Sequence, residues 1–306
     1  MKTVILGTRS SALALAQVEL TRAALLKVDP ALEVLVEKFV TQGDQKLDLG
    51  LLQSTPGGGK GLFTKELEVA LLERRIDVAV HSLKDLPATM PAGLSIGAVL
   101  ERADTADVLI RREPGGFEGL SKGAKVGTSS VRRARQLQWL RSDLQIVEWR
   151  GNVQTRLRKL IEQQDVGGIV LAKAGLDRLG FDTASGQLEF EGNKLWVESM
   201  AGKMLPAIGQ GAVALQMEEA REDVAQLLAK VNHGTTWTAI RAERELQRLL
   251  EGDCTLPVGV RTTVDGDKIS MRAILFEEGE KEPREGSAES VDAESVAKSI
   301  SQKLRP

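Results

Sequence analysis

The chain has 306 residues, of which 42% are hydrophobic and 27% charged, and its formal net charge is −2. These proportions are typical of a globular protein of two or three domains. The single cysteine excludes a disulfide within the chain and favours a reducing compartment, so we expect a cytoplasmic protein. No run of about 18 apolar residues is present, so we expect no contact with a membrane. The negative charge and an aromatic content of 3% argue against nucleic-acid binding.

Short apolar runs alternate with amphipathic stretches in the first two-thirds of the chain. The expected strands are 4–7, 34–40, 77–80, 124–127, 145–148 and 168–171, and the expected helices are 10–27, 62–74, 130–140 and 153–163. This alternation predicts α/β layers with largely parallel sheets. After residue 223 the order changes to helices at 224–231 and 236–250, strands at 258–263 and 268–275, and a helix at 291–304. That order predicts a smaller, separate α+β domain.

A glycine-rich segment, residues 43–61, interrupts the alternation. Long loops inside a compact domain are uncommon and are usually functional or mobile, so we expect a lid over an active site. The run Gly57-Gly58-Gly59-Lys60-Gly61 does not match a phosphate-binding P-loop, because glycine follows the lysine where serine or threonine is required.

Polar clusters follow four of the expected strands, at the carboxyl ends where open α/β sheets bind ligands. They are GTRSS (7–11), VHSLKDLP (80–87), VGTSSVRR (126–133) and WRGN (149–152). Three of them lead into an expected helix, whose free backbone N–H groups attract anions. Helix capping alone would also explain serine and threonine at these positions.

Arginine is concentrated in the middle of the chain. Residues 122–178 contain twelve Lys or Arg and five Asp or Glu, and five arginines there follow expected strand ends: Arg132, Arg133, Arg150, Arg156 and Arg178. Solvated helix faces would explain the charge alone. The planar fork of arginine, however, binds carboxylates and phosphates in a bidentate manner. Five such groups therefore favour a cleft that holds several anions.

Two further residues are candidates for chemistry. Asp85 follows an expected buried strand, where a carboxylate could move a proton or stabilise a cation. Cys254 lies on an expected turn between Gly252 and Pro257, and it is either an inert buried thiol or, facing a basic cleft, a nucleophile or attachment point. A Ser–His–Asp triad at 81–85 has weak support because no G-x-S-x-G motif is present. With one Cys and two His, no metal site is expected.

Seven short motifs occur along nearly the whole chain in a fixed order: GTRSS (7–11), GGKGLF (58–63), HSLKD (81–85), GTSSVRR (127–133), RGN (150–152), GQGA (209–212) and EGDC (251–254). Each is weak alone, but the set resembles the porphobilinogen deaminase (hydroxymethylbilane synthase) family. The resemblance implies a transferase of tetrapyrrole (haem) biosynthesis. Such an enzyme condenses four porphobilinogen molecules head to tail into hydroxymethylbilane and releases ammonia at each step. It further implies a monomer.

The resemblance also implies a dipyrromethane cofactor, bound through a thioether to Cys254. Asp85 is then the catalytic residue, which stabilises the electron-poor azafulvene left when ammonia departs. The implied cofactor-binding residues are Cys254, Lys84, Ser82, Thr128, Ser130, Arg132, Arg133, Arg150 and Gly151. The implied substrate-binding residues are Arg9, Ser11, Gln17, Phe63, Arg156 and Arg178.

The implied fold has two periplasmic-binding-protein-like α/β domains flanking a cleft, and a smaller α+β C-terminal domain. The expected domains are 1–101 with 197–219, then 102–196, then 223–306, with hinges near 102 and 196. The chain departs from the family pattern at Ala12, where proline is common, at Asp253, where a small residue is common, and in an unusually long lid. A carboxylate beside Cys254 is expected to slow cofactor attachment.

A hypothesis from a different functional class, a binding protein without enzymatic activity, is also open. Two lobes of this kind could close on a small anion without any chemistry, as in a solute-binding or effector-sensing module. The mass of the intact protein separates the two readings, because only the enzyme carries two additional pyrrole units.

Overall fold

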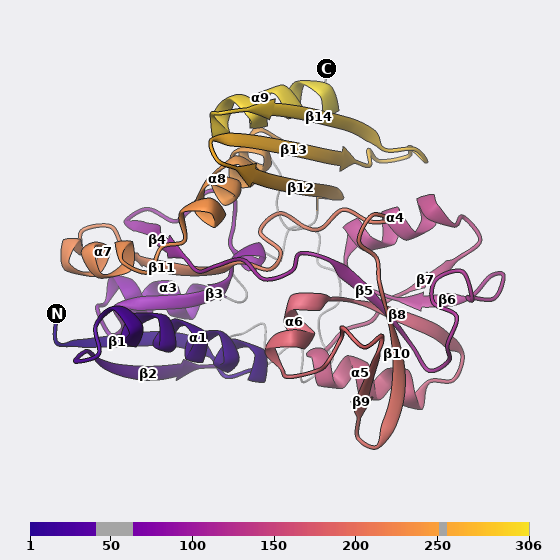
Figure 1. Ribbon diagram of the computed structural model, residues 1–306, viewed down its shortest axis with the longest axis horizontal. Coiled ribbons are helices and arrows are strands. Elements are labelled where there is room, and N and C mark those ends of the chain that lie inside the picture. Colours follow the sequence, from indigo (N-terminus) through magenta and orange to yellow (C-terminus); the bar gives the residue numbers. More distant parts are fainter. Residues whose placement is uncertain (41–63, 251–255, 306) are drawn as a thin grey trace. The chain divides into compact units, whose positions relative to one another are not determined.

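The computed structural model describes residues 1–40, 64–250 and 256–305 (Figure 1). The chain forms two compact units. Unit 1 comprises Met1–Ala103 with Gly211–Cys254, and unit 2 comprises Asp104–Gln210 with Thr255–Pro306.

Unit 1 is built on a five-stranded mixed sheet with the order β2-β1-β3-β11-β4. Its strands are β1 (Thr3–Arg9), β2 (Glu33–Phe39), β3 (Val78–Ser82), β4 (Leu94–Val99) and β11 (Val213–Glu218). β1 pairs in parallel with β2 and β3, whereas β11 runs antiparallel to both β3 and β4. The strand that returns from unit 2 therefore inserts between two strands of the N-terminal segment.

Helices cover both faces of this sheet because its strands are apolar on both sides. The helices are α1 (Ala12–Val28), α3 (Lys65–Leu72), α7 (Glu222–Ala229) and α8 (Gly234–Leu249). Val18 and Leu25 of α1 pack with Leu6 on one face, and Leu67 of α3 packs with Ile76 on the other. Ser11 caps α1, since its Oγ accepts a hydrogen bond from the Ala14 N–H at 3.3 Å, and Ala12 is the first residue of that helix.

Unit 2 contains a six-stranded mixed sheet with the order β7-β6-β8-β5-β10-β9. Its strands are β5 (Asp107–Arg111), β6 (Lys125–Gly127), β7 (Gln145–Val147), β8 (Val166–Ala172), β9 (Gln187–Phe190) and β10 (Asn193–Ser199). β6 pairs in parallel with β7 and β8, and the other pairings are antiparallel. The helices are α4 (Val131–Leu140), α5 (Val153–Glu162) and α6 (Lys173–Arg178). The carboxyl ends of three neighbouring strands thus meet at one edge.

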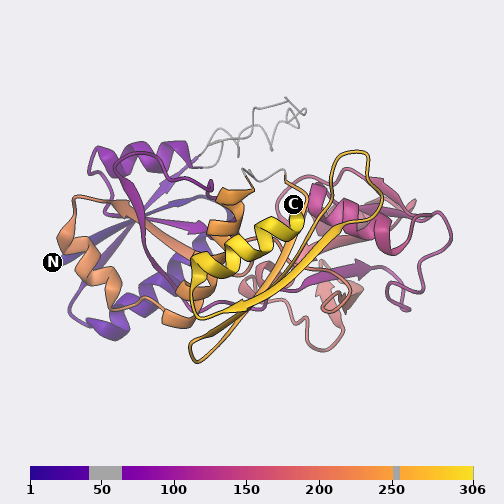
Figure 2. The ribbon, with the colours of Figure 1, turned by 90° about the horizontal axis from the view of Figure 1, so that it is seen from above.

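A second sheet of unit 2 is antiparallel and three-stranded, with the order β12-β13-β14. It consists of β12 (Val258–Asp265), β13 (Lys268–Leu275) and β14 (Arg284–Ser290). Helix α9 (Ala293–Leu304) packs along one face of it (Figure 2). Near the start of β12, the Val260 N–H donates to the Pro206 carbonyl oxygen at 2.8 Å. Ile274 and Phe276 pack on Leu205.

Every strand and helix expected from the sequence is present where the structure describes the chain, with shifted ends. The expectation of largely parallel sheets is wrong, because both large sheets are mixed. Strands β4, β5, β9, β10, β11 and β14 were not expected. One of them, β5, is buried along its whole length and lacks the alternation by which half-buried strands are recognised.

The three-domain division stays a prediction. In the structure the chain passes from unit 1 to unit 2 after Ala103 and returns after Gln210, while position 196 lies inside β10. Helix α8 belongs to unit 1. None of the described helices combines the length and apolar character needed to cross a lipid bilayer.

Candidate active site

In unit 1, parallel pairing of β1 with β3 places two of the predicted clusters side by side. Arg9 ends β1 and Ser11 follows it, whereas Ser82 ends β3 and Asp85 follows it. These four residues, with Gln17 and His81 among others, line a cavity of about 70 Å³. The Gln17 Nε2 donates to the Ser82 Oγ at 2.8 Å, which joins α1 to the end of β3. The structure therefore brings together five of the residues predicted for the active site.

Asp85 ends a single 3₁₀ turn, η1 (Leu83–Asp85), that is anchored from both sides. Leu83 and Leu86 are buried on either side of it, and the Leu86 N–H closes the turn on the Leu83 carbonyl oxygen. The Asp85 side chain itself is exposed, and in the described part of the chain its carboxylate forms no hydrogen bond or ion pair. Lys84, on the same turn, is half-buried. A firmly held backbone thus presents an unengaged carboxylate, as a cation-stabilising group requires.

Arg244 of α8 fastens the segment that follows Asp85, and sequence reasoning missed it. Its Nη2 donates to the carbonyl oxygens of Pro87 and Ala88, each at 3.0 Å. Burial lowers the pKa of Arg244. No local signal marks this residue, because its partners lie more than 150 positions away.

His81 is buried and pairs with Gln216 of β11, with 2.9 Å between Nε2 and Oε1. Burial lowers the pKa of His81 to about 4; the hydrogen bond to Gln216 opposes this shift and the positive charge of Arg9 adds to it. The ring is therefore neutral at pH 7. Because His81 pairs with Gln216 and Ser82 with Gln17, the structure argues against the Ser–His–Asp triad considered from the sequence.

This histidine predicts a loss of stability in mild acid. An unfolded histidine titrates near pH 6.5, so between pH 6.5 and 4 the unfolded state binds more protons and stability falls as pH falls. From pH 7 to pH 5 the contribution of His81 to the unfolding free energy should drop by about 2 kcal/mol. Urea unfolding at several pH values should show a shallower pH dependence for His81→Asn. Equal slopes for both proteins would contradict the prediction.

In unit 2, Thr128 and Ser130 shape the turn between β6 and α4. The Ser130 Oγ accepts from the Arg133 N–H at 3.5 Å, and the Thr128 Oγ1 accepts from the Ser130 N–H at 3.2 Å. The Ser130 hydroxyl therefore caps α4, and the Thr128 hydroxyl holds the turn before this helix; their part in binding a cofactor stays a prediction. The turn also points the first N–H groups of α4 away from the helix, toward any bound anion.

Arg132 and Arg133 are almost completely buried, at 4% and 5% exposure. Both bind the carboxylate of Asp107, the first residue of β5: Arg132 Nη1 lies 2.7 Å from Oδ2, and Arg133 Nη2 lies 2.8 Å from Oδ1. Burial alone would raise the pKa of the Asp107 carboxyl, yet the two guanidinium groups hold it well below its ordinary value. Asp107 was missed because nothing local links it to arginines about 25 positions later.

The remaining predicted arginines follow strands that flank β6. Arg150 comes after β7 and pairs with Glu148, with 2.5 Å between Nη2 and Oε1. Gly151 has a φ of 123°, and a Cβ there would lie 2.7 Å from Thr155 Cγ2, so only glycine fits without strain. Arg178, at the end of α6 after β8, is half-buried, and burial lowers its pKa. Arg156 lies in the first turns of α5, also half-buried.

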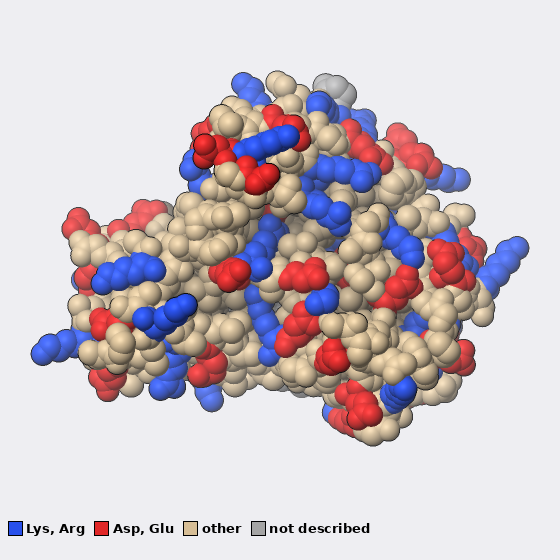
Figure 3. Space-filling view, viewed as in Figure 1, with Lys and Arg blue, Asp and Glu red and all other residues tan. Residues whose placement is uncertain are grey.

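Part of the basic excess in residues 122–178 is neutralised at the surface. On the face shown in Figure 3, Lys and Arg side chains lie among Asp and Glu. Ion pairs join Lys125 to Asp165, Arg141 to Asp143, Arg158 to Glu191, and Lys173 to Asp177. Such exposed pairs contribute little stability, about 0–1 kcal/mol each. The solvated-surface reading is thus correct for these cations, but not for the buried Arg132 and Arg133.

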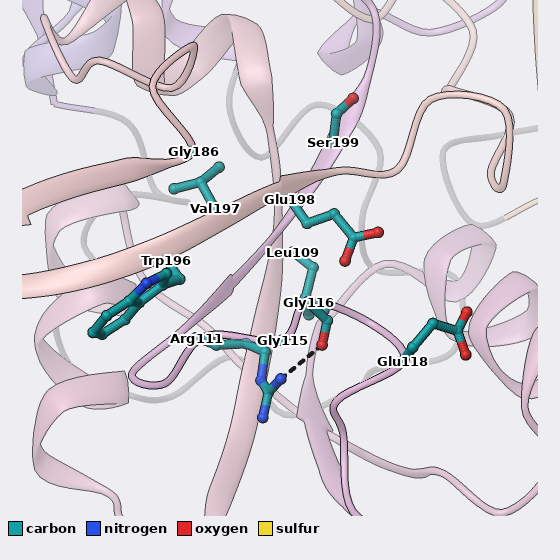
Figure 4. Close-up of a pocket in the computed structure, with 10 residues that line it drawn as sticks. All are labelled: Leu109, Arg111, Gly115, Gly116, Glu118, Gly186, Trp196, Val197, Glu198 and Ser199. Carbon is teal, nitrogen blue, oxygen red and sulfur yellow. Dashed lines mark hydrogen bonds between the residues drawn. The ribbon is translucent and has the colours of Figure 1, made fainter.

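A larger cavity of about 520 Å³ lies elsewhere in unit 2, next to β5 and β10 (Figure 4). The guanidinium group of Arg111 donates to three carbonyl oxygens of the adjoining loop, at Pro114, Gly116 and Gly119. Arg111 thus holds the loop. No residue predicted for the active site lines this cavity.

Some predicted positions lie outside the described residues. They are Phe63, Cys254, Asp253 and the expected lid, 43–61. Within the described ranges, no three His, Cys, Asp or Glu side chains gather as a metal site would require.

Comparison with known families decides among the readings. Residues 4–226 match the model "Porphobilinogen deaminase, dipyromethane cofactor binding domain", and residues 237–306 match "Porphobilinogen deaminase, C-terminal domain". The chain belongs to the porphobilinogen deaminase family.

Curated porphobilinogen deaminases are similar over almost the full length. The protein of Syntrophomonas wolfei is 41% identical, over 94% of this chain and 90% of the relative. That of Carboxydothermus hydrogenoformans is 40% identical, over 99% and 94%. Among solved structures, the ligand-binding component of an ABC-type import system from Staphylococcus aureus is 12% identical with a TM-score of 0.44, over 80% of this chain and 77% of that one.

These matches confirm the predicted family, the enzyme class and the dipyrromethane cofactor. The predicted fold class is confirmed as well: two α/β sheets are joined to a separate C-terminal α+β part. The porphobilinogen deaminase cofactor carries acetate and propionate groups. The cluster of Arg132, Arg133 and Asp107 suits such a ligand, since it holds two positive charges against one negative charge.

Proposed function

We propose that the chain condenses four porphobilinogen molecules head to tail into hydroxymethylbilane. The observation that carries the proposal is the match of both porphobilinogen deaminase models, together spanning most of the chain. Each addition forms a carbon–carbon bond between the aminomethyl carbon of one porphobilinogen and a free pyrrole α-carbon. It breaks the carbon–nitrogen bond of the aminomethyl group and releases ammonia, and the attacking α-carbon loses its proton.

A dipyrromethane attached to Cys254 would supply the first free α-carbon. Around it, we assign the carboxylates of cofactor and substrate to basic and polar side chains. Lys84, Ser82, Thr128, Ser130, Arg132, Arg133, Arg150 and Gly151 are assigned to the cofactor, and Arg9, Ser11, Gln17, Phe63, Arg156 and Arg178 to the substrate. Paired N–H donors of arginine match the two oxygens of a carboxylate, so these groups orient the rings by their acidic substituents.

Asp85 is assigned the chemical role. Departure of ammonia leaves an electron-poor azafulvene, and a fixed carboxylate stabilises positive charge that develops there. Two features support this assignment: buried neighbours hold the turn that carries Asp85, with Arg244 fastening the segment after it, and the carboxylate is exposed. The same carboxylate can accept hydrogen bonds from pyrrole N–H groups or help to move a proton at the α-carbon.

We further propose that the protein acts as a monomer in the cytoplasm, with porphobilinogen as its small-molecule partner and without nucleic acid. The single cysteine supports a reducing compartment.

Intact-protein mass spectrometry tests the proposal directly. Protein freshly expressed in cells with an intact haem pathway should exceed the mass of the chain by two pyrrole units, and it should convert porphobilinogen to hydroxymethylbilane. A solute-binding module would instead have the mass of the unmodified chain. An unmodified Cys254 that reacts fully with an alkylating reagent would overturn the enzymatic proposal.

A further inference from the structure

We propose that Asp107 is a positioning residue for Arg132 and Arg133, and that it fixes these two arginines for the carboxylates of the cofactor. The inference rests on the proposed function, which assigns both arginines to the cofactor. Asp107 opens β5 and is 3% exposed, and the arginines lie in the first turn of α4. The carboxylate thus joins the start of a central strand to the start of the helix.

Four donors saturate the two oxygens of Asp107. Oδ2 accepts from Arg132 Nη1 at 2.7 Å. Oδ1 accepts from Arg133 Nε at 3.0 Å, Arg133 Nη2 at 2.8 Å and Gln210 Nε2 at 2.9 Å. Because Arg133 binds through both Nε and Nη2, the plane of its guanidinium group is fixed by this one carboxylate.

Further bonds hold the outer parts of both side chains. Arg133 Nη1 donates to the Val170 carbonyl oxygen at 3.1 Å, and Arg132 Nη1 donates to the Leu205 carbonyl oxygen at 2.5 Å. A guanidinium group has five N–H donors, so the hydrogen bonds to described residues leave one N–H on each terminal nitrogen of Arg133. The Nε of Arg132 is buried and has no hydrogen-bond partner among the described residues. Donor capacity therefore remains after Asp107 is satisfied.

The charge of the cluster points the same way. Among the described residues, two buried guanidinium groups pair with one buried carboxylate, which leaves an excess of one positive charge. A buried charge without a partner is costly, so an ion pair with a purely structural role would be expected to balance. The N-terminus of α4, with Ser130 as its cap, adds partial positive charge at the same place. An anion bound there balances this charge, and Asp107 determines which N–H groups of the two arginines donate to that anion.

The test compares Asp107→Asn and Asp107→Glu with the unaltered protein, and scores the fraction of folded molecules that carry the cofactor by intact mass. Asparagine turns an N–H₂ group toward an arginine and removes the shared anion, so we expect this fraction to fall about tenfold. Asp107→Glu keeps the charge but displaces it by one methylene, and an intermediate fraction is expected. Asp143→Asn is the matched control, because Asp143 also accepts two bonds from an arginine of unit 2, Arg141, and it should keep full occupancy.

Occupancy is measured only on the monodisperse, folded fraction, so a general loss of stability does not imitate the effect. If Asp107→Asn does not fold, Asp107→Glu decides alone. Folded Asp107 variants with the occupancy of the unaltered protein would overturn the inference. Arg133→Gln separates the two levels. Full cofactor occupancy in Arg133→Gln would count against the assignment of Arg133 to the cofactor. Low occupancy in Arg133→Gln together with full occupancy in the Asp107 variants would contradict only the role of Asp107.

Discussion

Replacement of Cys254 by serine is expected to abolish cofactor attachment and with it nearly all turnover. A hydroxyl is far less nucleophilic than a thiolate, so the thioether has no counterpart in the variant. The purified Cys254→Ser protein should have the mass of the unmodified chain. Its rate of hydroxymethylbilane formation should fall by about a thousandfold or more, because the growing chain has no anchor.

The composition of the chain makes this experiment unambiguous. Cys254 is the only cysteine, so any thioether adduct or alkylation reports on that position alone. Asp253→Gly is a suitable companion variant. Removal of the neighbouring carboxylate should leave more thiolate at neutral pH and speed attachment of the cofactor to newly made protein. An adduct of two pyrrole units on Cys254→Ser would show that the anchor lies elsewhere.

Asp85→Ala is expected to keep the fold and the cofactor but to lose most of the turnover. Loss of a preorganised charged group at a reacting centre typically lowers kcat by about a hundred- to a thousandfold. The folded state should be little affected, because the Asp85 side chain is exposed and its turn is held by the buried Leu83 and Leu86. Single-turnover and steady-state assays with porphobilinogen, together with intact mass, measure both effects.

Asp85→Asn refines the result, since it preserves shape and removes only the negative charge. If electrostatic stabilisation is the main role, asparagine and alanine should be about equally impaired. Asp267→Asn, which alters an exposed carboxylate in the turn between β12 and β13, serves as the control for the general effect of removing a charge. Turnover near that of the unaltered protein in Asp85→Ala would show that the catalytic role belongs to another group.

Sequence reasoning located three polar clusters at strand ends because the signals of these clusters are local. GTRSS at the end of β1, HSLKD at the end of β3 and GTSSVRR at the end of β6 each combine a strand end with a turn, and each lies where it was expected. Sequence reasoning did not distinguish side chains that are exposed from side chains that already bind other residues of the protein. Thr128 holds the turn before α4, and Ser130 caps that helix. Arg132 and Arg133 bind Asp107, whereas Asp85 is exposed. The burial of a side chain and the residue to which it binds depend on which segments pack together, and the spacing of residues along the chain does not determine this packing.

The sequence by itself determined the family, the single thiol available for a covalent cofactor, and the position of most helices and strands. Those features follow from residue identities and from periodic patterns that extend over only a few helical turns or a single strand. Only the tertiary structure decided that β11 inserts between β3 and β4, that Gln216 holds His81, and that one aspartate serves two arginines. Each of these contacts joins segments separated by about 25 to 135 residues, and such contacts arise from the packing of whole layers.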